Sequence, residues 1–138
     1  MPMTKSSESK QSVFTTDSEN KISDSAKLID LVTEGLLEKK AKDIKVLDVR
    51  NLTTLTDFFV VCHGTSDTQI GALANSVMEK VKEESGENVW QREGLEGRRW
   101  VILDYVNVVV HIFSEEKRDY YGIERMWNDA LITEVSDT

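Results

Sequence analysis

A short apolar run at residues 58–63 leads directly into Gly64 and a helix start, and this junction constrains the fold more than any other feature. Ser66 and Gln69 have the three-residue spacing of a capping box, which marks a helix N-terminus. Apolar residues then recur at helical spacing as far as Gly86, a residue type that commonly ends helices. Together with a strand-like run at 88–92, the pattern predicts two parallel strands joined by a helix in a right-handed crossover.

Further elements of both kinds flank this unit. Apolar residues at three- and four-residue steps predict an amphipathic helix over 25–41, and a branched run predicts a strand over 44–49. Residues 99–104 and 106–113 are two strands too close for anything but a hairpin, and the second is apolar on both faces and should lie centrally. A helix over 115–132, interrupted at Gly122, follows, with one face formed by Tyr120, Ile123, Trp127 and Leu131. The fold class is therefore α/β, a single domain with a mixed β-sheet flanked by helices.

Composition divides the chain into a tail and a folded part. Residues 1–23 contain too few apolar groups to offset the entropy of ordering, and we expect a disordered polar tail there. The charges of this segment cancel, so the formal net charge of −8 falls on the remainder. The domain is expected over residues 24–133, with a frayed C-terminus at 134–138.

The composition also disfavours several classes of function. No stretch approaches the roughly 20 apolar residues that span a bilayer, so no membrane partner is expected. The single cysteine, Cys62, rules out a disulfide framework and a Cys-rich zinc site, and it suits a reducing, cytoplasmic location. With 17 Lys and Arg against 25 Asp and Glu, the chain lacks the excess of cations from which direct nucleic-acid binding draws its affinity.

The residues best suited to metal binding or catalysis are dispersed. Cys62 and His63 are neighbours on a predicted strand and point to opposite faces, so at most two of Cys62, His63 and His111 converge. Because a catalytic metal commonly takes three protein ligands, we predict no metal, no cofactor and no catalytic residue. His111, on one face of the central strand, is interpreted as a hydrogen-bonded core histidine.

The Gly64-Thr65-Ser66 turn is the strongest candidate for enzyme chemistry, because N–H groups at a helix N-terminus can cradle a phosphate. Such a turn occurs in nucleotidyltransferase-type folds, where paired carboxylates on later strands hold two metal ions. No such pair follows Gly64, and Asp104 stands alone at a strand end. A capped helix start is the favoured interpretation, and a nucleotidyltransferase-like enzyme or a nucleotide-binding sensor is the alternative.

The three tryptophans are candidates for partner contacts, because Trp often anchors protein interfaces. Trp90 and Trp127 fit core or helix-packing positions. Trp100 shares a strand face with Asp104, and Tyr105 follows at the turn, which indicates a protein-binding patch. The alternative is that a helix simply covers Trp100.

Several spaced blocks of sequence resemble one family. They are Asp48-Val49, TDFFVVCHGTSD at 56–67, Glu93-Gly94, WVILDY at 100–105, VVVHIF at 108–113, RDYY at 118–121, Glu124-Arg125 and Trp127. Their order over residues 25–128 is similar to that in the ribosomal silencing factor family, known as RsfS or Iojap. The usual family turn between the last two strands reads Asp-Tyr/Leu-Gly-Asp, whereas this chain has Asp104-Tyr105-Val106-Asn107.

The resemblance implies a binding protein and not an enzyme. Family members have a nucleotidyltransferase-like core without its catalytic acids. They bind the fourteenth ribosomal protein of the large subunit and block subunit joining, which represses translation under nutrient limitation. The family's contact region corresponds here to Trp100, Asp104 and Tyr105, with Leu103 beside them. Members are often homodimers, so a homodimer is expected, and a dimeric scaffold for another partner is a further hypothesis.

Overall fold

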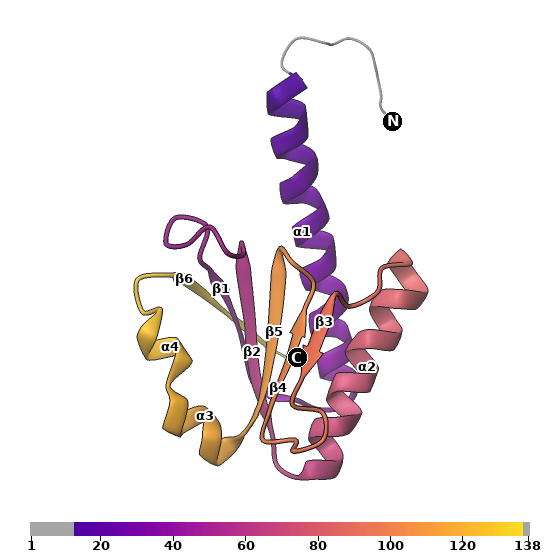
Figure 1. The fold of residues 1–138 in the computed structure, drawn as a ribbon, viewed down its shortest axis with the longest axis vertical. Helices are drawn as coiled ribbons and strands as arrows, with labels where there is room; N and C mark the ends of the chain where they lie inside the picture. The colour runs from indigo at the N-terminus through magenta and orange to yellow at the C-terminus, as the bar shows by residue number, and fades with distance from the viewer. Residues whose placement is uncertain (1–12, 137–138) are drawn as a thin grey trace.

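The computed structural model describes the backbone of residues 13–136 and the side chains of residues 24–136. Within this part of the chain, six strands form one sheet in the order β3-β4-β5-β2-β1-β6 (Figure 1). The strands are β1 Lys42–Asp48, β2 Phe58–Gly64, β3 Gln91–Glu93, β4 Trp100–Asp104, β5 Val108–Ser114 and β6 Leu131–Val135. β2 and β5 are parallel, and the other neighbouring pairs are antiparallel. The predicted fold class, a mixed sheet flanked by helices, is confirmed.

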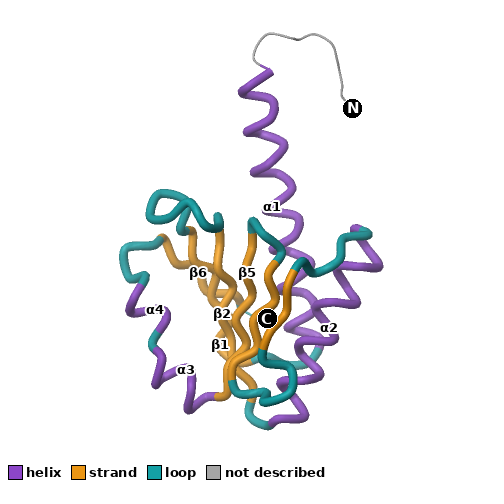
Figure 2. Tube along the Cα trace, in the orientation of Figure 1, coloured by secondary structure: helices purple, strands orange, loops and turns teal. Residues whose placement is uncertain are grey.

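Helices lie on both faces of this sheet. α1 Val13–Glu38 and α2 Asp67–Ser85 cover one face, and the short helices α3 Glu115–Tyr121 and α4 Ile123–Met126 lie on the other (Figures 1 and 2). β5 contacts both layers from an inner position, as its apolar pattern predicts. Its side chains divide accordingly, with Val110 in the core beneath α1 and α2 and Phe113 in a smaller core on the side of α3 and α4. Among the described residues, no helix has both the length and the apolar character needed to cross a membrane.

Helix α2 begins and ends as the sequence predicts. Ser66 Oγ accepts a hydrogen bond from Gln69 N at 3.1 Å, and Gly86 ends the helix in the left-handed region with a φ of 77°. The predicted strand–helix–strand unit is only partly correct, because β2 pairs with β5 and not with β3. β3 has the same direction as β2 but lies beyond β5 and β4. The β4–β5 hairpin takes the intervening places, since a short connection closes at a smaller entropic cost.

Helix α1 starts earlier than predicted. Its backbone is helical from Val13, whereas we expected a helix only from residue 25 and a disordered tail over residues 1–23. The stretch from residue 13 to residue 34 contains neither glycine nor proline, the two residue types that most often interrupt a helix. The C-terminal half of α1 packs against the sheet, and the helix therefore extends from this stable half toward the N-terminus. Figure 1 shows this first part of α1 extending well beyond the sheet. The expectation for residues 1–12 lies outside the described residues.

The C-terminal region is shorter in helix than predicted and ends in a strand. α3 stops at Gly122, which adopts a left-handed φ of 58°, and α4 ends at Met126 instead of continuing to residue 132. The chain then turns through Asn128 and Asp129, both common turn residues, and β6 pairs antiparallel with β1. The prediction of a frayed end is therefore wrong for residues 134 and 135, which belong to β6, and residues 137–138 lie outside the described part.

Candidate functional site

Strand β4 distributes the four predicted contact residues over both faces of the sheet. Because side chains alternate along a strand, Leu103 and Tyr105 point beneath α1 and α2, where they are 0% and 3% exposed. Trp100 and Asp104 lie on the other face and are half-buried. The structure therefore brings Trp100 and Asp104 to one surface, whereas Leu103 and Tyr105 belong to the core.

Trp100 lies in a group of packed rings beside α3. Its indole Nε1 donates a hydrogen bond to Nδ1 of His111 at 3.1 Å, and its ring centroid lies 5.0 Å from that of Phe113 and 4.5 Å from that of Tyr121. We name this group the aromatic cluster: Phe59, Trp100, His111, Phe113, Tyr121 and Trp127. α3 covers one side of the Trp100 ring through Tyr121, and the residue keeps exposed surface, so the interpretation of a partner-binding patch stays a prediction.

His111 is the buried polar member of the aromatic cluster. It is 6% exposed, and burial lowers its pKa to about 4, so the ring is neutral at pH 7. Because Nδ1 accepts the hydrogen bond from Trp100, the ring proton lies on Nε2, for which the described residues offer no partner. The interpretation of His111 as a hydrogen-bonded core histidine is confirmed, and that hydrogen bond connects it to the Trp100 indole.

Asp104 shapes the turn at the end of β4. Its Oδ1 accepts a hydrogen bond from Val106 N at 2.7 Å, and Tyr105 N donates to Val108 O at 2.9 Å, which closes the hairpin. Val106 has a φ of 75°, in the left-handed region where the family's usual turn has glycine. The hairpin thus forms without that glycine, with Asp104 fixing the strained residue.

Sequence reasoning missed Tyr121 as a surface residue of this site. It is 43% exposed and packs against Trp100, while Tyr120, which we expected on the packed face of the helix, is 72% exposed. We predicted an interruption at Gly122 but still placed residues before and after it on one helical face, whereas α3 ends there. The signal available was Gly122 itself, a residue type that favours helix ends.

Cys62 and His63 lie on opposite faces of β2, as predicted. Cys62 is fully buried beneath α1 and α2, and burial raises the pKa of its thiol to about 12, which makes it a poor nucleophile. His63 Nδ1 lies 3.0 Å from an Nη1 of Arg118, and burial, helped by that guanidinium, lowers the His63 pKa. Within residues 24–136, no three His, Cys, Asp or Glu side chains are arranged to hold a metal ion.

The polar groups of the Gly64 turn form hydrogen bonds with neighbouring side chains of the same segment. Gln69 Oε1 accepts a hydrogen bond from Thr65 N at 2.7 Å, and Gln69 Nε2 donates to the carbonyls of Lys39 and Lys40 at 3.0 Å each. Ser66 Oγ accepts a hydrogen bond from Gln69 N. The interpretation of this turn as a capped helix start is confirmed, and the cap also ties α2 to the C-terminal end of α1.

The other two tryptophans differ from each other. Trp127 packs edge-on against Phe59 with a centroid distance of 5.4 Å, in agreement with a helix-packing position. Trp90 is 64% exposed, so its expected position in a core or against a helix is wrong. It precedes β3, a strand whose residues are all exposed at the sheet edge, and therefore has no second layer to cover it.

Comparison with known proteins gives a consistent family. A family model described as ribosomal silencing factor during starvation matches residues 22–138. Proteins named ribosomal silencing factor RsfS from Chromobacterium violaceum and Bacillus subtilis are 44% and 38% identical to this chain over 97 and 98 residues. These matches cover 70% and 71% of this chain and 79% and 82% of the two relatives. The chloroplastic protein Iojap of Zea mays is 36% identical over 71% of this chain and 42% of its own length.

Solved structures agree with the sequence relatives. A crystal structure of a Chromobacterium violaceum protein has a TM-score of 0.72 at 42% identity, covering 75% of this chain and 85% of the other. A crystal structure of a Bacillus halodurans protein has a TM-score of 0.67 at 34% identity, covering 80% and 98%. On these matches in sequence and structure, the chain belongs to the RsfS family of ribosomal silencing factors.

Proposed function

We propose that this protein represses translation by binding the large ribosomal subunit at its fourteenth ribosomal protein and blocking subunit joining under nutrient limitation. Membership of the RsfS family supports the general function, since its relatives carry the name ribosomal silencing factor. We also propose a cytoplasmic location and, for the free protein, a homodimer, both from the family resemblance. Binding and steric exclusion suffice for this function, and no catalytic step is part of it.

The observation that carries the proposal is the half-exposed Trp100, which stands where α3 ends and the described helices leave the rest of β4 uncovered on this face. On this face α3 contacts β5 and β2, and among the described residues β4 is covered by α3 only where Tyr121 packs against Trp100 (Figure 1). Ile102 and Asp104 are half-buried along the same face, and Tyr121 packs against Trp100 from the end of α3. An aromatic anchor with an apolar neighbour and a charged rim is the composition of a protein interface.

The charge of this surface suits a basic partner. Asp104 is joined on the same face by Glu93 of β3, which pairs with Ile102 in the sheet. The whole chain carries a net charge of −8, which attracts a basic ribosomal protein and repels exposed phosphates. We propose Trp100, Tyr121 and Asp104 as contact residues. Leu103 and Tyr105 support them from the core.

Co-sedimentation with purified large subunits tests the proposal, with small subunits as the negative control. We expect Trp100→Ala and Tyr121→Ala to weaken binding at least about tenfold, a loss of about 1.4 kcal/mol typical of interface anchors. Trp100→Phe keeps the stacked ring and loses only the bond to His111, so it should retain most binding. Wild-type protein that fails to pellet with large subunits, or that pellets equally with small ones, overturns the proposal.

A matched pair of charge variants tests the rim. Asp104→Asn keeps the acceptor for Val106 N and removes the charge, whereas Asp30→Asn removes a charge on exposed α1 behind the sheet. We expect weaker binding and a weaker salt dependence for the first and no change for the second. Calorimetry with nucleotides and Mg²⁺ separates the nucleotide-binding alternative, which predicts heat of binding at the Gly64 turn.

A further inference from the structure

Trp90 stands at the rim of a hollow between α2 and β3. The hollow has a volume of ≈ 540 Å³ and lies on the edge of the molecule away from α3 and α4. Trp90 N donates a hydrogen bond to Asp104 O at 2.9 Å, so the backbone that carries the indole is fixed to β4. The ring itself is 64% exposed and, among the described residues, has no aromatic or cationic partner. The Trp90 indole thus offers a large, flat and mostly exposed surface on a fixed backbone.

The walls of this hollow combine polar and apolar side chains and carry two cations. Lys82 comes from α2 and Arg92 from β3, and their only opposing charge in the lining is Glu79. The rest of the lining is formed by three amide side chains and two apolar ones: Asn75, Asn88, Gln91, Met78 and Val89. Arg92 Nη1 lies 3.8 Å from Met78 Sδ, which keeps the guanidinium over the hollow.

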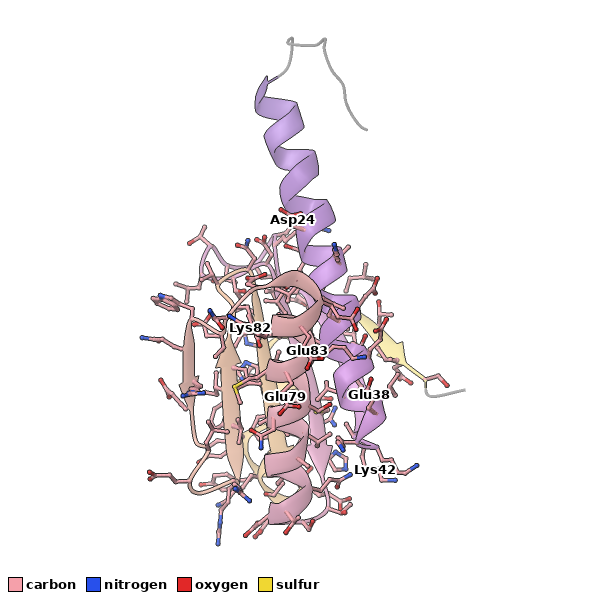
Figure 3. The ribbon with its side chains drawn as sticks, turned by 90° about the vertical axis from the view of Figure 1, so that its right-hand side faces the viewer. Asp24, Glu38, Lys42, Glu79, Lys82 and Glu83 are labelled. Atoms are coloured by element: carbon pink, nitrogen blue, oxygen red, sulfur yellow. The ribbon has the colours of Figure 1, made fainter. Side chains whose placement is uncertain are left out.

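The positive charge is local. Figure 3 looks onto α2 and shows Glu79 and Glu83 along the helix, with Glu38 on neighbouring α1, so the α1–α2 surface beside the hollow is rich in acids. Lys80 on that surface is already paired with Glu38 and Glu84. In contrast, Lys82 and Arg92 form no ion pair among the described residues, and both remain available to an anion.

We propose that this hollow binds a nucleotide of single-stranded RNA. The base stacks on Trp90, the adjoining phosphates pair with Lys82 and Arg92, and the amides of Asn75, Asn88 and Gln91 hydrogen-bond the base edge. Exposed aromatic rings beside cations are the recurring elements of single-strand recognition. The two cations beside the ring, unpaired among the described residues, favour a nucleotide over a protein partner, whose anchors require apolar pockets. This RNA site is a local exception to our expectation that the acidic chain does not bind nucleic acid directly, and it depends on two cations that no acid pairs with in the described part of the chain.

A stacking test uses a fluorescein-labelled oligoadenylate of about eight nucleotides, within the site sizes of single-strand binders, in fluorescence anisotropy at low salt. We expect Trp90→Ala to raise the dissociation constant at least about fivefold, the lower end for loss of one stacked base. Trp90→Phe keeps a ring and should stay within about threefold of wild type. Trp90 is mostly exposed, so circular dichroism should show both variants folded.

A charge test separates a built site from diffuse attraction. Arg92→Gln should weaken binding and lower the salt dependence by about 0.7 in the logarithmic slope, the value for one contacted phosphate on a single strand. Lys39→Gln removes the same charge from an exposed position at the end of α1 and should change neither quantity.

Three results overturn the proposal. They are no binding of wild type to the oligonucleotide at about 50 mM salt, equal binding by wild type and Trp90→Ala, and equal losses in Arg92→Gln and Lys39→Gln. The inference does not depend on the proposed ribosomal-protein contact: Trp100→Ala should bind the oligonucleotide as wild type does. If Trp90→Ala weakens binding to large subunits while oligonucleotide binding is unchanged, the hollow takes a protein and the RNA proposal is wrong.

Discussion

Val106 is a branched residue in a backbone conformation that favours glycine. Its φ is 75°, and the side chain is half exposed and contributes nothing to the core. We expect Val106→Gly to raise the free energy of unfolding by about 0.5–1 kcal/mol, because relief of left-handed strain of about 1–2 kcal/mol exceeds the extra entropy of an unfolded glycine. Urea denaturation measures the change.

Neighbouring Asn107 provides the control for this prediction. Its φ is not in the left-handed region, so Asn107→Gly adds entropy to the unfolded chain without relieving strain and should lower stability. An equal gain in both variants would show that the turn is limited by something other than the φ of Val106.

His111 makes stability depend on pH. Its pKa is about 4 in the folded protein, against 6.5 for an unperturbed imidazole, so the unfolded chain binds a proton more readily between these values. Stability is therefore fully present above pH 6.5 and falls as the pH drops toward 4, by an amount on the order of 3 kcal/mol for this group. His111→Asn, which keeps an acceptor for the Trp100 indole, should lose this contribution to the pH dependence.

The measurement is urea denaturation of wild type and His111→Asn across that pH window. Carboxylates titrate in both proteins, so the informative quantity is the difference between the two curves. His63→Asn is the comparison, because the His63 pKa is lowered in the same direction but the ring is only partly buried. Parallel curves for wild type and His111→Asn would contradict the assigned pKa.

At the scale of elements, α1 and α2 cross at a glycine. A Cβ on Gly35 would lie 3.2 Å from the backbone of Ser76 and Val77, and Ser76 Oγ donates to Gly35 O at 2.7 Å. We expect Gly35→Ala to push the helices apart and to cost about 1–3 kcal/mol, the range for overpacking, despite the better helix propensity of alanine. Thermal unfolding followed by circular dichroism checks it.

Gly97 offers a matched control in the β3–β4 loop. A Cβ there meets nothing within 4 Å, and the residue does not have a positive φ. Gly97→Ala should be neutral or slightly stabilising through the unfolded chain. If the two alanine variants are equally stable, the helix crossing is not as close as the structure has it.

The elements that sequence patterns predicted correctly are those whose signals are local. The capping box at Ser66, Gly86 and the short link before β5 each operate within a few residues, and all three features are present in the structure. β6 was missed because its residues are mostly exposed, so no alternating burial distinguished the strand from a helix end. The partnership of β2 with β5 depends on chain closure over many residues, which no local pattern records.

Only part of the geometry of the candidate site was predicted correctly, because some of its residues meet through tertiary contacts. Alternation along β4 correctly placed Trp100 with Asp104, but grouping Tyr105 with them ignored that the same alternation sends it to the opposite face. Tyr121 reaches Trp100 only because α3 folds back over the sheet after β5, a tertiary contact. The exposure of Trp90 likewise follows from the sheet order, which makes β3 an edge.

At the scale of the whole molecule, Arg118 connects segments that lie far apart in the sequence. It is buried, forms two hydrogen bonds of 2.9 Å with the Glu124 carboxylate, contacts His63 Nδ1 at 3.0 Å and lies 3.7 Å from Asp43. α3, α4, β1 and β2 thus share one guanidinium. The Glu124 pKa is lowered chiefly by its hydrogen bonds with Arg118, which indicates that the pair is ionised.

Arg118→Lys should therefore loosen the α3–α4 layer from the sheet. An ammonium cannot reproduce the planar two-bond contact with Glu124 and also reach His63, so we expect a loss of about 2–4 kcal/mol, near the range for a disrupted buried pair. Arg125→Lys is the matched control, because Arg125 is exposed and donates a single bond to Asp119 O, and it should change stability by less than about 0.5 kcal/mol. Since α3 carries Tyr121 against Trp100, Arg118→Lys should also weaken large-subunit binding while Arg125→Lys does not. Urea unfolding and co-sedimentation of these two variants test this prediction. An Arg118→Lys variant as stable as wild type would show that packing of Ile123 and Trp127, and not the ion pair, holds the α3–α4 layer in place.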